Sequence, residues 1–167
     1  YEPDGIHALL SGLTGYGWVP VEEGGKLIAL VRDGGSVTLE PAGQFELSGA
    51  ALTDINDIKT ELDTHLTEAK AVGDKLGIGF SALGFTPTWS RADVHVMPKG
   101  RYKIMTAYMP KVGHLGLDMM YRTCTVQANL DFSLQADMAK KLRVALALQP
   151  VATALFANSP FTEGKPN

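Results

Sequence analysis

Residues 36–48 alternate between apolar and polar side chains with a period of two. The apolar side chains fall at odd positions and include Val37, Leu39, Phe45 and Leu47. Because successive side chains of an extended strand point to opposite faces, this pattern predicts a strand with one face in the core and one polar face. Pro41 and Gly43 interrupt the alternation and predict a bulge or bend, since proline lacks an amide donor and glycine tolerates positive φ.

The polar face of this stretch carries Glu40 and Glu46 among hydroxyl and amide side chains, and it contains no lysine or arginine. Carboxylates gathered on a rigid strand without counter-charges suit a hard cation such as Mg²⁺, which prefers oxygen ligands. The alternative is an ordinary sheet surface that faces solvent. The pattern alone leaves both interpretations open.

Patterns on both sides of this stretch predict further elements. Residues 26–32 form a predicted strand, followed by a turn at Asp33-Gly34-Gly35 that suits positive φ. A helix is predicted to begin after Thr53 or Asp54, with His65 as a boundary residue rather than a ligand. Its apolar residues keep helical spacing, namely Ile55, Ile58, Leu62, Leu66, Ala69 and Leu76. Residues 78–85, which are small and apolar, predict a buried strand.

Residues 118–132 repeat the alternating design. Their polar positions carry hydroxyl, amide and carboxylate groups, namely Thr123, Thr125, Gln127, Asn129 and Asp131. A face that merely meets solvent would be expected to carry lysine and glutamate instead. If this second strand pairs in the same sheet as residues 36–48, the two polar faces line one cavity, which favours a functional site. Helices are predicted from Pro98 to Pro110 and after Ser133.

Composition narrows the function classes. The chain has 167 residues, 45% of them hydrophobic, which is enough for one core of ordinary size. A net charge of -3 without any lysine or arginine cluster argues against a nucleic-acid partner. No apolar run is long enough to span a bilayer, so we expect no membrane partner. The single cysteine, Cys124, excludes a disulfide within the chain and indicates a reducing compartment.

Several linked motifs are similar to those of glutamate–cysteine ligases of the plant and proteobacterial type. They are EPAGQFELSG at 40–49, MPKGRY at 97–102, YMPKVG at 108–113, GLDMM at 116–120, RTCTVQANLDF at 122–132 and ALFANSPFTEGKPN at 154–167. Their number and matching order make this resemblance far more specific than a single short motif would be.

The resemblance implies an α+β fold of the glutamine-synthetase-like kind. In this fold an antiparallel sheet curves into a funnel, and helices pack on its outer face. Residues 1–167 would then be a single segment of a larger catalytic domain, with the fold incomplete in this chain. The implied activity is ATP- and Mg²⁺-dependent ligation of the glutamate γ-carboxylate to the cysteine amine through γ-glutamyl phosphate. This reaction is the first step of glutathione biosynthesis.

The resemblance also assigns candidate ligands for the metal and the nucleotide. Glu40 and Glu46 match the family's acidic strand and would bind Mg²⁺. Gln127 occupies a strand position where relatives carry a metal or nucleotide ligand, and Asn129 is its neighbour on the same face. We therefore expect Gln127 and Asn129 to contribute to the binding of ATP.

Two arginines are candidates for substrate binding. Arg101, in the MPKGRY motif, resembles the arginine that holds a glutamate carboxylate, for which the planar guanidinium fork is well matched. A surface arginine without function is the alternative. Arg122 is a weaker candidate because it falls on the apolar side of its strand. Cys124 is expected to pack in the core, since the mechanism needs no nucleophile.

The resemblance further implies that a first acidic strand and a second substrate arginine lie outside residues 1–167. We therefore expect the segment alone to be inactive and to need the remaining segments of the parent enzyme. An exposed sheet edge would favour a homo-oligomer. The expected compartment is the cytoplasm, or the plastid for a plant-like source. The alternatives are another carboxylate–amine ligase of the same superfamily, or a non-catalytic fragment that requires partner segments.

Overall fold

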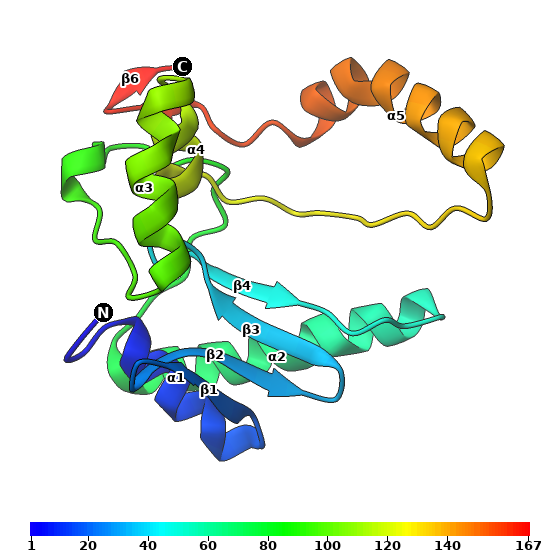
Figure 1. The fold of residues 1–167 in the computed structure, drawn as a ribbon. Coiled ribbons are helices and arrows are strands. Elements are labelled where there is room, and N and C mark those ends of the chain that lie inside the picture. The colour runs from blue at the N-terminus through cyan, green and yellow to red at the C-terminus, as the bar shows by residue number, and fades with distance from the viewer. The chain divides into compact units, whose positions relative to one another are not determined.

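A computed structural model describes residues 1–167 and divides them into two compact units. The first unit contains residues 1–81 and 91–122, and the second contains residues 82–90 and 123–167. Each unit is described by itself (Figure 1). That the whole chain is one segment of a larger domain stays a prediction.

The first unit contains an open antiparallel sheet of four strands in the order β1-β2-β3-β4. The strands are β1 (Val19–Glu23), β2 (Lys26–Arg32), β3 (Gly35–Leu39) and β4 (Phe45–Ser48). The predicted strand at 26–32 and the turn after it are confirmed. Asp33 and Gly34 have φ angles of 51° and 85° in this turn, in a region that glycine adopts without strain and that aspartate tolerates. The predicted α+β class is confirmed as well.

Of the bulge or bend predicted at Pro41 and Gly43, the structure shows a bend, which is the turn of a hairpin between two strands. The Gly43 amide donates to the Glu40 carbonyl over 2.9 Å, and Gly43 has a φ of 84°. β3 and β4 therefore pair antiparallel, with Val37 opposite Leu47 and Thr38 opposite Glu46. The predicted separation of an apolar face from a polar face is confirmed. In the hairpin it extends over two paired strands, since residues directly opposite each other lie on the same face.

Two helices pack on the apolar face of this sheet: α1 (Ile6–Leu13) and α2 (Ile55–Leu76) (Figure 1). The residues that are almost completely buried come from α1, β2 and β3, namely Leu9, Leu10, Leu13, Leu30, Val37 and Leu39. Removing these large side chains from water is the main driving force for this core. A short 3-10 helix, η1 (Thr14–Tyr16), leads from α1 into the first strand.

The start of α2 is confirmed, but its predicted buried stripe is only partly buried. The Asp54 side chain accepts from the Asn56 amide over 2.7 Å, as expected for a helix cap. The side chains of the predicted stripe from Ile55 to Leu66 are exposed, whereas Ala69 is buried. The buried face is formed by His65, Glu68, Ala69, Val72 and Gly73. The packed face is therefore confined to the C-terminal half of α2, and there it includes two polar residues.

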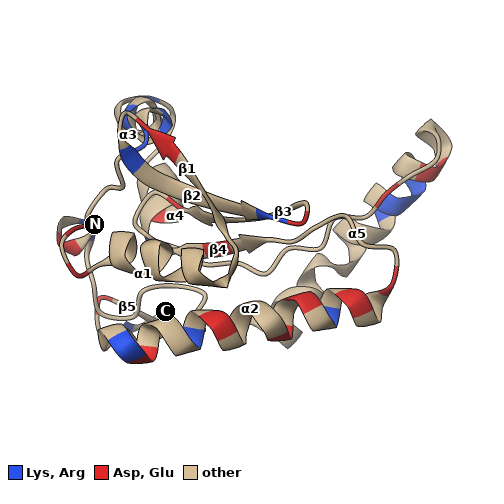
Figure 2. Cartoon of the chain, turned by 90° about the horizontal axis from the view of Figure 1, so that it is seen from below, with Lys and Arg blue, Asp and Glu red and all other residues tan.

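The exposed side of α2 carries acidic and basic residues along its length (Figure 2). Lys70 and Asp74 form an ion pair of 2.9 Å one helical turn apart, and Lys59 pairs with Asp63 in the same way. Such exposed pairs each contribute only a few tenths of a kcal/mol or about 1 kcal/mol at most, so packing rather than charge holds α2 in place.

A buried polar network joins α2 to the sheet. The Trp18 indole donates to Glu68 over 2.8 Å, and Arg32 donates to the other oxygen of Glu68 over 2.9 Å. The Arg32 guanidinium also lies 4.3 Å from the centre of the Trp18 ring. Because Glu68 has partners for both carboxylate oxygens, its burial does not leave an uncompensated charge.

The remaining elements of the first unit are η2 (Arg91–Asp93), α3 (Gly100–Val112) and α4 (Gly116–Arg122). Met97 and Tyr102 belong to the same core cluster as Leu39. The start of α3 is thereby held at the end of the sheet. Pro110 lies inside α3, so the predicted end of this helix is two residues early.

The second unit contains α5 (Gln135–Phe156) and a small hairpin of β5 (Phe161–Thr162) and β6 (Lys165–Pro166). The strands predicted at 78–85 and 118–132 are both wrong. Residues 116–122 form α4, residues 124–132 have no regular structure, and the only strand-like contact is an isolated bridge between Phe85 and Thr123. Alternation predicts an extended chain, but a strand also needs a neighbour that pairs with its backbone. None of the helices of the described chain combines the length and apolar character needed to cross a membrane.

Gly12 lies where α1 crosses α2, and we predict that replacing it with alanine destabilises the first unit. A Cβ atom at Gly12 would lie 2.4 Å from Cγ1 of Val72, a buried and β-branched side chain that cannot rotate away. Overpacking outweighs the gain in helix propensity, so we expect a loss of about 1–2 kcal/mol in the free energy of unfolding. Urea denaturation measures this loss. Gly15→Ala is the matched control, since its Cβ would meet nothing within 4 Å; an equal loss in both variants would contradict the prediction.

The buried imidazole of His65 should make stability depend on pH. His65 stacks on Phe45 at 5.3 Å, and burial, followed by the charge of Arg32, lowers its pKa from 6.5 despite Glu68 and Glu61. The unfolded chain therefore binds a proton at His65 more tightly than the folded chain does. The free energy of unfolding is highest above pH 6.5, and it falls as the pH drops from 6.5 towards the lower pKa of His65 in the folded state. We expect the urea midpoint to fall less in His65→Phe than in the wild type between neutral and mildly acidic pH. His95→Gln, which removes an exposed histidine, should keep the wild-type dependence; equal dependence in all three proteins would show that His65 is not responsible.

Candidate functional site

The candidate site lies where the β3–β4 turn meets the segment that leads into α3. The Met97 amide donates to the Pro41 carbonyl over 2.8 Å. The Lys99 ammonium donates to the Leu39 carbonyl over 2.8 Å, and the Tyr102 hydroxyl donates to the same carbonyl. These backbone acceptors hold the MPKGRY segment against the end of the sheet.

Glu40 and Glu46 lie on the polar face of the hairpin. Glu46 stands opposite Thr38, and the Glu40 amide donates to the Gln44 carbonyl over 3.0 Å, so the alternation brings both carboxylates to one face. Glu40 is half-buried and Glu46 is exposed, with the Ser48 hydroxyl donating to Glu46 over 2.9 Å. The structure therefore brings these two predicted residues together.

The inference that this face has no counter-charge is wrong. Lys99 and Arg101, which lie more than fifty residues further along the chain, supply positive charge at the same place. Burial lowers the pKa of Lys99, while Glu40, Glu23 and Glu46 raise it and Arg101 lowers it. Periodicity along one strand cannot reveal cations that arrive from another element.

Tyr102 is buried beside these charges. Burial, and then the negative charge of Glu40, raises the pKa of Tyr102 to about 12, with smaller contributions from Glu46 and from a hydrogen bond with Glu40. The hydroxyl therefore keeps its proton at physiological pH and acts as a hydrogen-bond donor.

Arg101 is the exposed member of the cluster. Its guanidinium makes no ion pair or hydrogen bond within residues 1–167, although its charge acts on Lys99 and Tyr102. A guanidinium held near a packed helix start, with its donors free, is suited to bind a carboxylate or phosphate.

Arg122 has a different environment from the one predicted for a strand residue. It lies in α4, its side chain is 3% exposed, and it donates to Asp118 over 3.1 Å. Asp118 also pairs with Arg91 at 3.3 Å. Gln44 donates to the Met120 carbonyl over 3.1 Å, which ties the hairpin turn to the same helix. The described contacts of Arg122 serve packing, and its role in substrate binding stays a prediction.

Gln127 and Asn129 lie in the second unit, in the irregular stretch after the isolated bridge. Both are exposed, and Gln127 donates to the Thr125 hydroxyl over 3.2 Å. Their convergence with the carboxylates of the hairpin stays a prediction. Cys124 is exposed rather than packed in the core, because residues 124–132 have no sheet to cover them.

Comparison with known proteins decides the family. A family model described as glutamate-cysteine ligase family 2 matches residues 2–167. The chain belongs to this family. It is 59% identical over 165 residues to the chloroplastic glutamate–cysteine ligase of Arabidopsis thaliana, a match that covers 98% of this chain and 32% of that protein. It is 58% identical over 163 residues to the enzyme of Medicago truncatula, with 97% of this chain and 32% of that protein covered.

The resemblance found in the motifs is thus confirmed at the level of the family. The match to ligase A of Oryza sativa subsp. japonica, with 56% identity, covers 98% of this chain and 34% of that protein. The chain therefore spans about a third of the length of the curated relatives that it matches.

A magnesium site of this family can be tested against the donor atoms that the chain provides. Within residues 1–167, no group of three or more histidine, cysteine, aspartate or glutamate side chains could hold a metal ion by itself. Glu40 and Glu46 nevertheless share one face, and Mg²⁺ is commonly bound through one or two carboxylates together with substrate phosphates and water. The two carboxylates therefore fit part of a Mg²⁺–nucleotide site of the ligase family.

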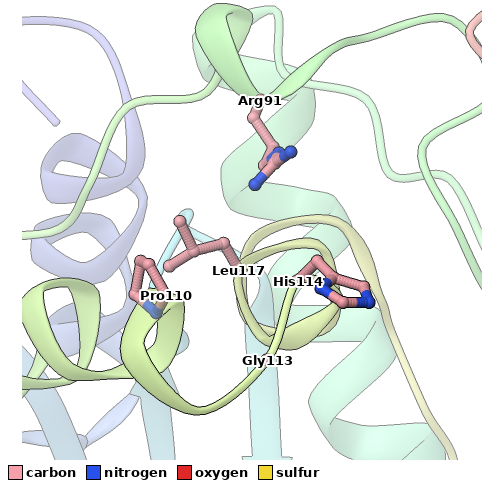
Figure 3. Close-up of a pocket in the computed structure, with 5 residues that line it drawn as sticks. All are labelled: Arg91, Pro110, Gly113, His114 and Leu117. Carbon is pink, nitrogen blue, oxygen red and sulfur yellow. The ribbon is translucent and has the colours of Figure 1, made fainter.

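Two hollows adjoin α3 in the first unit. One of about 530 Å³ is lined by Val96, Met97, Pro98, Lys99, Gly100, Lys103, Thr106 and Ala107. A smaller one of about 240 Å³ is lined by Arg91, Pro110, Gly113, His114 and Leu117 (Figure 3). The first hollow reaches the candidate site through Lys99, whereas no residue of the second belongs to the site.

Sequence reasoning missed Lys99 and Tyr102 as members of the site. Both lie in the MPKGRY motif, next to Arg101, so the motif itself held the signal. The ring of Tyr102 is buried, at 2% exposure, as expected for an aromatic side chain in a helix that packs on the core. The hydroxyl is the part that reaches the site of this ligase-family chain.

Proposed function

We propose that the chain forms part of an enzyme that ligates the γ-carboxylate of glutamate to the amine of cysteine. In the first step a γ-carboxylate oxygen attacks the terminal phosphorus of ATP and ADP leaves. In the second step the cysteine amine attacks the acyl carbon of γ-glutamyl phosphate, and phosphate and a proton leave. The observation that carries this proposal is the cluster of Glu40, Glu46, Lys99 and Arg101 in a chain of the ligase family.

Glu40 and Glu46 are the residues that would hold Mg²⁺. When bound, the ion offsets negative charge on the nucleotide phosphates as the phosphoryl group moves. The two carboxylates are suited to this role because the pairing of β3 with β4 fixes the backbone that carries them. Neither carboxylate forms an ion pair within 4.0 Å with a lysine or arginine of the chain. A backbone fixed by strand pairing lowers the entropic cost of bringing the two carboxylates to one ligand, because only their side chains remain to be ordered.

Arg101 would hold a carboxylate of glutamate through its planar fork. Its exposure and its lack of an internal partner support this assignment. Lys99, which lies deeper, would add positive charge beside the transferred phosphoryl group. Gln127 and Asn129 are proposed to contact the nucleotide, and Arg122 to bind substrate as a weaker candidate.

The relatives support a location and a set of partners for the proposed enzyme. They are named as chloroplastic ligases, which favours the plastid over the cytoplasm. Their greater length supports the proposal that further segments of the parent enzyme complete the site. A homo-oligomer stays a prediction.

The experiment that tests the proposed function compares amine acceptors. The full-length enzyme, given glutamate, ATP and Mg²⁺, should release phosphate with cysteine far faster than with other amines, and mass spectrometry should detect γ-glutamylcysteine. Faster release with a different amine would favour another carboxylate–amine ligase. No release with any amine would favour a non-catalytic role.

Replacing either candidate metal ligand should reduce turnover strongly. Glu46→Gln and Glu40→Gln keep the size of the side chain but remove its charge, so we expect kcat to fall by on the order of a hundredfold or more with the fold intact. Glu22→Gln is the control, because Glu22 is exposed on β1 at the opposite edge of the sheet. Near-normal turnover and unchanged Mg²⁺ dependence in Glu46→Gln would refute the assignment.

Arg101→Lys should act through substrate binding rather than chemistry. Lysine keeps the positive charge but loses the two-pronged contact, so the KM for glutamate should rise about tenfold while kcat changes less. Arg143→Lys, at an exposed position of α5, controls for the exchange itself. If the KM for ATP rises and that for glutamate does not, Arg101 binds the nucleotide instead.

A further inference from the structure

The carbonyl of Leu39 is the acceptor that joins the two halves of the candidate site. It immediately precedes Glu40, and it accepts hydrogen bonds from both the Lys99 ammonium and the Tyr102 hydroxyl. The two donors come from elements that are 60 and 63 residues away in the sequence. A backbone oxygen held by two donors cannot rotate its peptide plane without breaking both bonds.

The Tyr102 hydroxyl has a second neighbour on the same side. It accepts from the Lys99 ammonium over 3.3 Å and interacts with the Glu40 carboxylate. Its single proton is donated to the Leu39 carbonyl, and the Glu40 carboxylate acts on the hydroxyl through its negative charge. The ring is 2% exposed in the core cluster, so packing fixes the direction in which the hydroxyl points.

This arrangement also determines where Arg101 stands. Arg101 lies between Lys99 and Tyr102 in the chain, at the first turn of α3. Because Lys99, two residues before Arg101, and Tyr102, directly after it, both donate to the Leu39 carbonyl, they restrain the backbone of Arg101 relative to Glu40. The peptide unit between Leu39 and Glu40 thus sets the separation between Glu40, the proposed metal ligand, and Arg101, the proposed substrate ligand.

We propose that Tyr102, supported by Lys99, is a positioning residue that holds the peptide unit between Leu39 and Glu40, and thereby places the Glu40 carboxylate for Mg²⁺ and in register with Arg101. This inference rests on the proposed function. Tyr102 acts through Glu40 and does not touch the substrate. In other proteins, loss of a group that orients a metal ligand without touching the metal weakens metal binding by about 10–100-fold.

The test uses Tyr102→Phe in the full-length enzyme. Phenylalanine keeps the buried ring and removes only the hydroxyl, so the melting temperature should stay close to that of the wild type. We expect the Mg²⁺ concentration for half-maximal activity to rise about tenfold, with the KM for glutamate changed less than about twofold. Tyr108→Phe is the matched control on the same helix, because the Tyr108 side chain is 57% exposed and has no hydrogen-bond partner in the described chain.

A second measurement does not depend on turnover. Mn²⁺ binding, followed by electron paramagnetic resonance with a non-hydrolysable ATP analogue present, should weaken about tenfold in Tyr102→Phe and stay unchanged in Tyr108→Phe. Unchanged Mn²⁺ affinity and unchanged Mg²⁺ dependence in Tyr102→Phe would overturn the inference. If Tyr102→Phe does not melt cooperatively, the Mn²⁺ affinity of Lys99→Met tests the inference instead. Lys103→Met, at an exposed position, is the control for that variant.

These outcomes separate the inference from the function on which it rests. If the wild type makes no γ-glutamylcysteine but Mn²⁺ binding still requires the Tyr102 hydroxyl, the proposed function fails and the positioning role stands. If the wild type is an active ligase and Tyr102→Phe matches it in both measurements, the function stands and the positioning role fails.

Discussion

The directions of the acidic side chains in the candidate site follow from the antiparallel pairing of β3 with β4, in which Thr38 stands opposite Glu46 and Leu39 opposite Phe45. The side-chain period of a strand is two, so a slip of one residue would turn Glu46 into the core and Phe45 towards solvent. Burial of Leu39 and the stacking of Phe45 on His65 therefore select the register that exposes the carboxylates. The hydrophobic core of the first unit and its polar face are two consequences of one pairing.

The site gains its charge balance from tertiary structure. The hairpin supplies two carboxylates, and the segment leading into α3 brings Lys99 and Arg101 to the same end of the sheet. Bonds to the carbonyls of Leu39 and Pro41 hold this segment, so the cations depend on backbone acceptors of the hairpin. A cluster with both signs of charge can hold a metal–nucleotide pair and an amino acid carboxylate side by side.

The errors of prediction share one physical origin. A pattern describes a single segment, whereas pairing and packing depend on a second segment that contacts it. Residues 124–132 alternate as a strand would, but no strand pairs along them, and the Cys124 amide, which donates to the Gly84 carbonyl over 3.0 Å, continues only the isolated bridge beside it. The apolar spacing of α2 from Ile55 to Leu66 predicts burial, yet α1 and the sheet cover only the part of α2 that contains Ala69 and Val72. Helical periodicity identifies which side chains share a face, and the contacts of that face decide whether water reaches it.

The sequence by itself determined the family, the strand at 26–32 with its turn, the cap of α2 at Asp54, and the polar face that carries Glu40 and Glu46. These depend on local backbone preferences, on a period of two, and on motifs that can be read along the chain. Tertiary structure alone decided that Pro41 to Gly43 form a hairpin turn, that Lys99 and Tyr102 meet at the Leu39 carbonyl, and that Arg122 is buried against Asp118. Those contacts join residues that are distant in the sequence or depend on which surfaces become covered, and a one-dimensional pattern contains neither kind of information.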